Sequence, residues 1–441
     1  MSKQGSAAMN TDSKKNRRKH VAREYAARIA APLLALLTLL CATVASAADV
    51  SIIAEYTPGM QSQSESGFRN VTKPANFCAA DSGGCAGVTT IDLPVGDVSY
   101  DALAADAGGQ NAVYFRGPGS PIRIELRDER TNRATAATFR ITGIVGRYSV
   151  RPDVYQLTGN PVGNAEAAHA ALWAGGSWQQ PPAGCTALSV QPMVTANAYR
   201  FGWRLPRDSG GSCSKVPRQP VPAGEIVLEG RSLAVAYELA TPDPVTLPNG
   251  VYRGVQTFTV GPGKDFDFGN HAHVARSTFD VEFVLKVRHQ FMVTDSGAGS
   301  DVKLAPAQGW LNWFSEGKPA AKIDRDVTFA LSTGEPLRVS LRCEDGDDSA
   351  GRCLIKNPRD SVVPVDLSLT VTGASTENKS AFSRIPLTTR TPASLDVDRY
   401  LDNARAIAHV AVDDKGVSEM GKNPGTTYSG RVSIVFDAIS E

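Results

Sequence analysis

The sequence has 441 residues, with 46 Lys and Arg against 45 Asp and Glu, and a formal charge of +1. Its length predicts two to three domains, and its apolar fraction of 42% is that of a globular protein. Positive charge is concentrated in residues 1–47, which hold eight Lys or Arg and two acids. Without them, 38 basic and 43 acidic residues remain, a charge of −5, which argues against nucleic acid as a partner.

Residues 1–47 have the layout of a secretory signal peptide. Basic residues precede an apolar run at 31–42, and Ala45 and Ala47 fit a small-residue cleavage site. The run is shorter than the roughly 18 residues that span a membrane, which disfavours an anchor. Bulky Leu40 before Cys41 disfavours a lipoprotein. We therefore expect cleavage after Ala47 and export through the periplasm.

Six cysteines follow the expected cleavage site. An even number in an exported chain predicts disulfides, and six cysteines allow about 15 pairings. Sequence proximity favours three pairs, each closing a loop rich in Gly, Asp or Ser: Cys78 with Cys85, Cys185 with Cys213, and Cys343 with Cys353. Metal ligation is the weaker alternative, because no Cys or His grouping has zinc spacing.

Alternation of apolar and polar residues predicts short half-buried strands along the chain. In the first half this pattern marks residues 50–56, 123–127, 139–145, 233–239 and 251–260, while residues 166–173 are the best short helix. The polar stretch 270–277 is interpreted as a linker. We therefore expect an N-terminal domain at 48–272 and a C-terminal domain at 273–441.

The second half repeats the strand pattern more regularly. Its predicted strands are 279–287, continued in phase by Phe291 and Val293, then 327–331, 337–341, 363–371, 404–412 and 428–436. Six or seven short strands separated by turns predict a β-sandwich. The expected fold class is all-β, with two tandem immunoglobulin-like sandwiches. Tyr252 and Gly254 echo Tyr428 and Gly430, which suggests that each domain ends on a similar strand.

The last predicted strand leads to the main functional expectation. Tyr428, Val432, Ile434 and Phe436 share one face, and only five residues follow position 436. A sheet that ends there has an open edge, which is an aggregation hazard unless another chain covers it. We expect these four residues to form the edge of a groove that accepts a donor strand. The first strand, 50–56, starts almost at the cleavage site and leaves no donor tail.

Several segments of the second half carry a family resemblance: residues 261–269 (GPGKDFDFG), 309–313 (GWLNW), 317–319 (GKP), 325–329 (RDVTF), 363–369 (VPVDLSL) and 428–432 (YSGRV). Over roughly residues 245–441 the chain resembles the tip adhesins, or pilus biogenesis initiators, of alpha-fimbrial pili. These are pili of the class 5, cable-pilus and colonization-factor type, assembled by the alternate chaperone–usher route. Upstream of residue 245 the resemblance rests on layout alone.

The resemblance implies a receptor-binding domain followed by a pilin domain that lacks its last strand. A periplasmic chaperone would supply that strand first, and the major pilin subunit would replace it by β-augmentation at an outer-membrane usher. The implied location is the pilus tip at the cell surface. The implied function is adhesion to a host glycan or glycoprotein and initiation of assembly, with no enzymatic activity and no cofactor.

Candidate receptor-binding residues lie just before Cys213: Arg200, Trp203, Arg204 and Arg207. A guanidinium beside an aromatic ring suits a sugar that carries a carboxylate. Ordinary surface arginines next to a core tryptophan are the alternative interpretation, and no family motif aligns with these residues.

Other chemistries fit the sequence less well. Ser209 and His169 sit in stretches similar to serine-protease loops, but forty positions are too few to place a barrel between them. Asp265, Asp267, His271 and His273 match no preferred metal spacing, and residues 344–348 match only half a calcium loop. Two alternatives stay open: a secreted carbohydrate-active enzyme built on β-sandwiches, and a structural pilus cap that binds no receptor.

Overall fold

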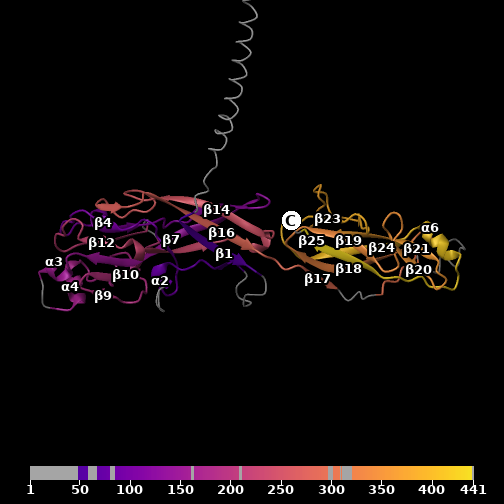
Figure 1. Ribbon diagram of the computed structural model, residues 1–441, viewed down its shortest axis with the longest axis horizontal. Coiled ribbons are helices and arrows are strands. Elements are labelled where there is room, and N and C mark those ends of the chain that lie inside the picture. Colours follow the sequence, from indigo (N-terminus) through magenta and orange to yellow (C-terminus); the bar gives the residue numbers. More distant parts are fainter. Residues whose placement is uncertain are drawn as a thin grey trace, which may run out of the picture. The chain divides into compact units, whose positions relative to one another are not determined.

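The structure is a computed structural model that is mostly β and has several sheets (Figure 1). It describes residues 48–57, 67–79, 85–159, 163–207, 211–295, 301–307, 309 and 320–439. The expected signal peptide, the segment holding Trp310 and Trp313, and Ser209 lie outside these residues. No helix of the described residues is long and apolar enough to cross a membrane.

The first β-region, residues 48–287, contains a 14-stranded sheet and a two-stranded sheet. Its elements are β1 (Val50–Tyr56), β2 (Arg69–Asn70), α2 (Asn76–Ala79), β3 (Thr89–Asp92), β4 (Val98–Tyr100), η1 (Gly109–Asn111), β5 (Val113–Arg116), β6 (Ile122–Asp128), β7 (Ala134–Val150), α3 (Val154–Thr158), α4 (Ala165–Leu172), β8 (Thr186–Ala187), β9 (Val194–Thr195), β10 (Ala198–Arg204), β11 (Ser212–Lys215), β12 (Ile226–Leu228), η2 (Gly230–Ser232), β13 (Ala234–Ala240), η3 (Pro244–Thr246), β14 (Gly250–Thr259), β15 (Ala272–Val274) and β16 (Thr278–Val287). The predicted helix at 166–173 is confirmed as α4.

Strand β7, 17 residues long, organises this region. It pairs with β6 near its start, with β13 and β10 further along, and with β12 at its end, all antiparallel. The pairing with β13 shifts register between Ala236 and Tyr237. A bulge of this kind bends a strand and increases its twist. In a simple sandwich these four partner strands would be divided between two sheets. Here all of them pair with β7, so the first region departs from a simple two-sheet sandwich.

The expected domain boundary at 272/273 is wrong, because β16 belongs to the first sheet. It pairs along its whole length with β14 and runs parallel to β1. Its inward residues, among them Phe279 and Phe283, are buried in the core of the first region. The stretch 270–277, expected as a linker, includes β15, which pairs with β4. Alternation identified β16 as a strand but could not show which sheet it joins.

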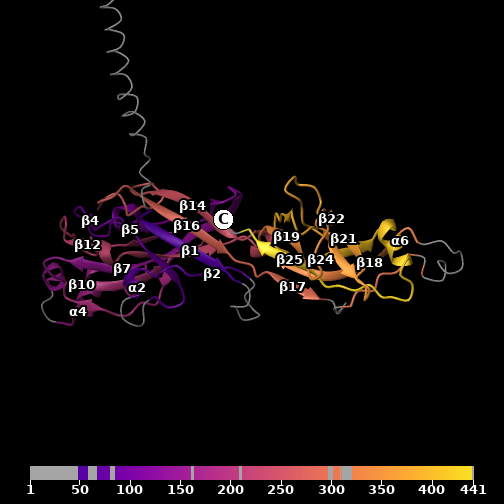
Figure 2. The same ribbon diagram turned by 45° about the vertical axis from the view of Figure 1, so that its right-hand side comes forward.

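The second β-region, residues 291–439, is built from two sheets that face each other (Figure 2). Its elements are β17 (Met292–Asp295), β18 (Ile323–Thr333), β19 (Leu337–Cys343), β20 (Cys353–Lys356), β21 (Val362–Val371), β22 (Ile385–Pro386), β23 (Ala393–Leu395), β24 (Leu401–Val412), α6 (Asp414–Gly421) and β25 (Val432–Ala438). The first sheet has the order β17-β18-β24-β21-β20, with β22 on β21, and the second has the order β23-β19-β25.

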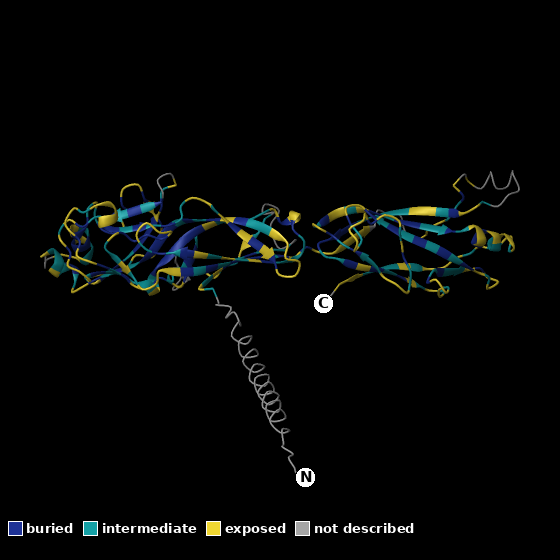
Figure 3. Ribbon diagram, turned by 90° about the horizontal axis from the view of Figure 1, so that it is seen from above, coloured by how far each residue is buried: buried dark blue, intermediate teal, exposed yellow. Residues whose placement is uncertain are grey.

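The two sheets of the second region share one apolar core. Leu331, Leu369 and Ala406 from the larger sheet and Val339 and Leu395 from the smaller one are fully buried in it. Buried positions alternate with half-buried ones along β21, as expected for a strand with one face in the core (Figure 3). This region has the two-layer arrangement of a sandwich, which the alternating sequence pattern predicted.

All three expected disulfides are confirmed: Cys78–Cys85, Cys185–Cys213 and Cys343–Cys353. The first ties α2 to the loop that follows it, and the second joins the loop before β8 to β11. The third joins β19 to β20, which lie in different sheets of the second region. Covalent links of this kind stabilise a fold mainly by restricting the unfolded chain.

Candidate functional site

Strand β25 lies at the end of the smaller sheet of the second region. It pairs with β19 on one side, with Val432 opposite Cys343 and Phe436 opposite Val339. No strand of the described residues pairs with its other side. The backbone groups along that outer edge therefore have no sheet partner within the described part of the chain, as on any open sheet edge.

The inward side chains of β25 are incompletely covered. Val432, Ile434 and Phe436 pack against the core of the second region, yet all three remain half-buried. The matching residues of β19, such as Leu337 and Val339, are almost fully buried. Burial thus falls from β19 to β25 within one small sheet, and the apolar core opens toward the unpaired edge.

The opposite wall of this opening comes from the edge of the larger sheet. Phe291 lies 6.0 Å and Phe329 6.3 Å, ring centre to ring centre, from Phe436. Phe291, Met292 and Val293 are 41–45% exposed, which is unusual for three consecutive apolar residues. We use the name acceptor groove for the partly covered apolar surface beside the unpaired edge of β25, which is formed by Phe291, Phe329, Val432, Ile434 and Phe436.

The expected groove edge is corrected at one position. Tyr428 lies before β25 and packs in a separate cluster with Val363, Val412 and Val417. Its hydroxyl group contacts Ser361 at 2.8 Å. Ser429 bridges to Lys356, so the chain joins another strand before it reaches β25. Phe291 and Phe329 contact Phe436 instead, although the sequence pattern did not assign them to the groove. The sequence feature that could have indicated Phe291 is the apolar alternation of β16, which continues in phase to this residue.

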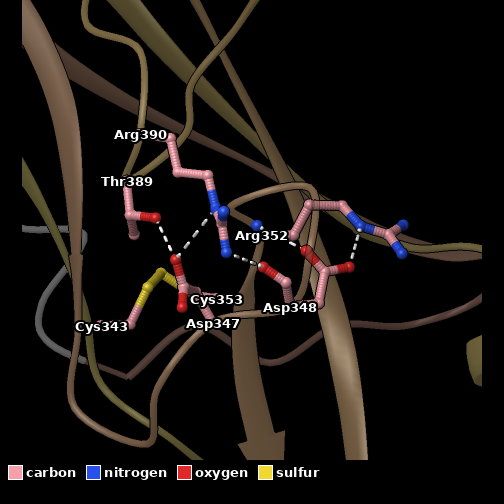
Figure 4. The surroundings of a disulfide bond; sticks show 7 residues. All are labelled: Cys343, Asp347, Asp348, Arg352, Cys353, Thr389 and Arg390. Atoms are coloured by element: carbon pink, nitrogen blue, oxygen red, sulfur yellow. Dashed lines mark hydrogen bonds and ion pairs between the residues drawn. A yellow bond between two sulfur atoms is a disulfide. The ribbon is translucent and has the colours of Figure 1, made fainter.

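The loop closed by Cys343 and Cys353 holds the far end of β19 (Figure 4). Three of its four acidic residues are paired with protein groups. Asp348 accepts a hydrogen bond from Arg352 at 2.8 Å, Asp347 accepts one from Thr389, and Asp345 forms an ion pair with Lys356 at 2.6 Å. Burial opposes ionisation of Asp348, but the hydrogen bonds from Arg352 and Ala350 outweigh it and lower its pKa. These carboxylates hold the loop in place through hydrogen bonds and ion pairs with the protein's own side chains.

The receptor-site candidates do not form the expected arginine–tryptophan pair. Trp203 is only 2% exposed, and its ring lies 4.8 Å from that of Trp178. Its indole Nε1 donates a hydrogen bond to the carbonyl oxygen of Trp178. Side chains alternate along β10, so Arg200 and Arg204 lie on the opposite face from Trp203. Trp203 is a core residue and cannot stack on a sugar bound to those arginines.

The three arginines have different surroundings. Arg200 is partly buried, with its guanidinium 5.2 Å from the ring centre of Phe77. Arg204 is exposed. Arg207 has a side chain that is 73% exposed and forms a 3.6 Å ion pair with Glu238. The structure therefore does not gather these residues around one point.

His169, which lies in a stretch similar to a serine-protease loop, is a buried structural residue. Trp173 donates a hydrogen bond to the hydroxyl oxygen of Tyr148, whose hydroxyl donates to Nδ1 of His169. Nε2 of His169 then donates to the carbonyl oxygen of Thr195 at 2.8 Å. This network assigns a neutral imidazole. Burial lowers the pKa of His169, because the charged form would lose its hydration.

We expect the stability contributed by neutral His169 to be lost in acid. Its pKa is lowered in the folded state, so this contribution is complete above the unfolded pKa of about 6.5 and declines as the pH falls below it. Urea unfolding between pH 7.5 and 5 measures the effect. In the variant His169→Gln, the free energy of unfolding should depend less on pH over this range. If the variant and the wild type show the same dependence on pH, this role of His169 is contradicted.

Three of the four candidate metal ligands make hydrogen bonds within the fold. Asp265 accepts hydrogen bonds from the backbone and hydroxyl groups of Thr259, and Asp267 accepts them from two backbone amides and from Gln110. His273 lies 2.8 Å from Asp101. Within the described residues, no group of three or more His, Cys, Asp or Glu side chains is arranged to hold a metal ion.

Comparison with known proteins found no matching family model and no curated relative. Structural matches extend over most of the chain at low identity. A chain of a chaperone–tip adhesin complex of CFA/I fimbriae biogenesis matches at 12% identity and TM-score 0.26, covering 89% of this chain and 97% of that one. CfaE, the adhesive subunit of CFA/I fimbria of enterotoxigenic Escherichia coli, matches at 10% identity and TM-score 0.28, covering 89% and 93%. The CsuC–CsuE chaperone–tip adhesion subunit complex of Acinetobacter baumannii matches at 9% identity and TM-score 0.22, covering 88% and 99%.

Proposed function

We propose that this chain is the tip subunit of a bacterial surface pilus and that it receives a strand from another protein. The observation that carries the proposal is the acceptor groove. An unpaired strand edge stands beside apolar side chains that the described residues leave half covered. An extended segment with alternating apolar residues would pair with the edge through its backbone and fill the groove with its side chains.

In this proposal the second β-region is a pilin domain of immunoglobulin-like design that lacks its last strand. A periplasmic chaperone supplies the strand during export, and a major pilin subunit replaces it at the outer-membrane usher. The first strand of the described chain, β1, is engaged in its own sheet with β16 and β2 and is not available as a donor. In this proposal the subunit lies at the end of the fibre, where it accepts a strand without giving one.

The first β-region is the adhesive domain in this proposal, presented at the pilus tip on the cell surface. It has a separate large core, and its exposed arginines offer contacts to a host glycan or glycoprotein. No part of the function requires catalysis. Most of the acidic and histidine side chains considered for metal or protease chemistry form hydrogen bonds and ion pairs within the fold.

Substitutions on the two faces of β25 test the proposal. Ile434→Asp places a charge in the apolar groove, so we expect the chain to lose its chaperone when the two are co-expressed. Ser433→Asp, one residue away on the exposed face, is the matched control and should retain the chaperone. The measurement is the amount of chaperone co-purified per adhesin. Equal recovery with both variants would show that the groove is not the binding site.

A further inference from the structure

Strand β1 is joined to the first β-region mainly through one neighbour. It runs parallel to β16 and pairs with it along all seven of its residues. On its other side it pairs with β2 at two positions, and Ile53 exchanges hydrogen bonds with Val71 and Thr72. β1 is the first described strand of the region and β16 is the last. The main partner of β1 is therefore available only when nearly the whole region is present.

The outward side chains of β1 match those of residues 276–286. Three polar contacts join the two segments: Asp49 with Arg276 at 2.7 and 2.9 Å, Ser51 with Glu282 at 3.1 Å, and Glu55 with Lys286 at 2.8 Å. Both carboxylates thus meet a cation of the same segment. These contacts fix the register, because a slip by one residue would turn the charged side chains toward the core.

The inward side chains of β1 fill the core of the first β-region. Ile52 and Ala54 are 0% and 1% exposed, and Val50 and Tyr56 pack against the same cluster. Apolar residues therefore alternate with polar ones, while the backbone pairs with one strand edge. A strand that binds in this way by β-augmentation has the same two features.

The slot that holds β1 is kept in place by other elements. β16 pairs with β14 along its whole length, on the side away from β1. Its inward rings have aromatic neighbours outside β1, with Phe279 lying 5.6 Å from Phe258 and Phe283 lying 5.2 Å from Phe139. None of these contacts involves β1. We therefore expect β16 to keep its place without β1 and to present an open apolar edge.

We propose that β1 is an internal donor strand: it fills a slot that the rest of the first β-region forms without it, and β1 of a second copy of this chain can replace it. The second copy fits because its β1 carries the same alternation and the same charges. Exchange of an identical strand preserves every contact. It leaves no strand free for the acceptor groove, and the inference does not depend on that groove.

The test uses the mature chain, residues 48–441, with the recognition site of a specific protease inserted after Thr57. Cleavage leaves residues 48–57 held by noncovalent contacts alone. A fluorescent peptide of residues 48–57, which stands for β1 of a second copy, is added in large excess at urea concentrations below the unfolding midpoint. We expect fluorescence anisotropy to show the peptide replacing the cleaved strand, while the near-UV circular dichroism of the buried tryptophans is retained.

Two neighbouring isoleucines give a matched pair of peptide variants. Ile52 is fully buried, whereas Ile53 lies on the opposite face and is half-buried. Ile52→Ala should weaken incorporation by about tenfold or more, as loss of a buried side chain does. Ile53→Ala should weaken it by about threefold at most. Equal losses would show that the peptide does not enter the core and would contradict the inference.

A charge exchange tests the register and the place of binding. Glu55 and Lys286 are register partners, so a Glu55→Lys peptide should bind the cleaved chain more weakly. The same peptide should bind a cleaved Lys286→Glu chain more tightly than it binds the cleaved wild type. Absence of this rescue, in a Lys286→Glu chain with an unchanged thermal midpoint, would show that the peptide binds in another register or in the acceptor groove.

Two further results would overturn the inference. If the labelled peptide is not incorporated at any urea concentration below the midpoint, β1 is inseparable from the core. If the cleaved chain loses its near-UV signal and added peptide does not restore it, no slot exists without the strand. Chaperone co-purification on the same preparations reports on the acceptor groove, so failure of this inference is distinguishable from failure of the proposed pilus function.

Discussion

Supplying a strand to the acceptor groove should raise the melting temperature of the second β-region by about 10 °C. A six-residue strand beside β25 adds about six hydrogen bonds of roughly 1 kcal/mol each. It also buries about three apolar side chains at roughly 1.5–3 kcal/mol each. Ordering the strand costs about 1–2 kcal/mol per residue, which leaves a net gain of a few kcal/mol. For a region of this size that gain corresponds to about 10 °C.

The strand can be added within the chain itself. An Asn-Gly turn placed after Ile439, followed by a segment alternating Val and Thr, would fold back antiparallel to β25. The same extension with each Val replaced by Asp is the control, since it can make the backbone bonds but cannot enter the apolar groove. Differential scanning calorimetry of both extended chains and the native chain gives the comparison. If the two extensions shift the melting temperature equally, the groove contributes nothing specific.

The second large effect is expected at Trp203. Its ring packs against Trp178 and Phe201 at 4.7–4.8 Å, and it is almost fully buried. Trp203→Ala should therefore destabilise the first β-region by about 3–5 kcal/mol, as large-to-small core substitutions do. The substitution would also remove the indole N–H that donates a hydrogen bond to the carbonyl oxygen of Trp178. Chemical denaturation followed by tryptophan fluorescence measures the loss.

Arg204 provides the comparison for this substitution. It adjoins Trp203 in β10 but is exposed, so Arg204→Ala should change stability by less than about 0.5 kcal/mol. If Trp203 were instead an exposed ring that stacks on a bound sugar, Trp203→Ala would leave the free energy of unfolding unchanged and would reduce only sugar binding. A stable Trp203→Ala protein would therefore contradict the core assignment.

Periodicity in the sequence was sufficient to locate most strands of seven or more residues, but it missed most of the shorter ones. The alternation of Val363, Val365, Leu367 and Leu369 appears in the structure as the buried face of β21. The three disulfides were correctly paired from proximity, because each loop is short enough for its ends to meet. Local signals of this kind depend on neighbours in the chain, which a sequence displays directly.

Features that depend on distant partners were harder to predict. Nothing in the pattern of β16 indicates that it pairs with β14 and β1, and so the domain boundary was placed too early. The alternation around Trp203 could not tell which face of β10 meets the core, since both faces carry large residues. Phe291 and Phe329 line the acceptor groove although they are 38 positions apart and lie far from β25 in sequence. Strand partners, buried faces and side-chain contacts of this kind are set only when the sheets assemble.

Hydrogen exchange along β25 tests the central claim most directly. Antiparallel pairing with β19 engages alternate backbone groups, so about half of the amides of β25 should exchange rapidly in the chain without a donor. Binding of a chaperone or addition of the Val–Thr extension should make those rapid amides slow, while the amides of β19 change little. Slow exchange at every amide of β25 before any strand is added would show that its outer edge is already paired, and would contradict the account.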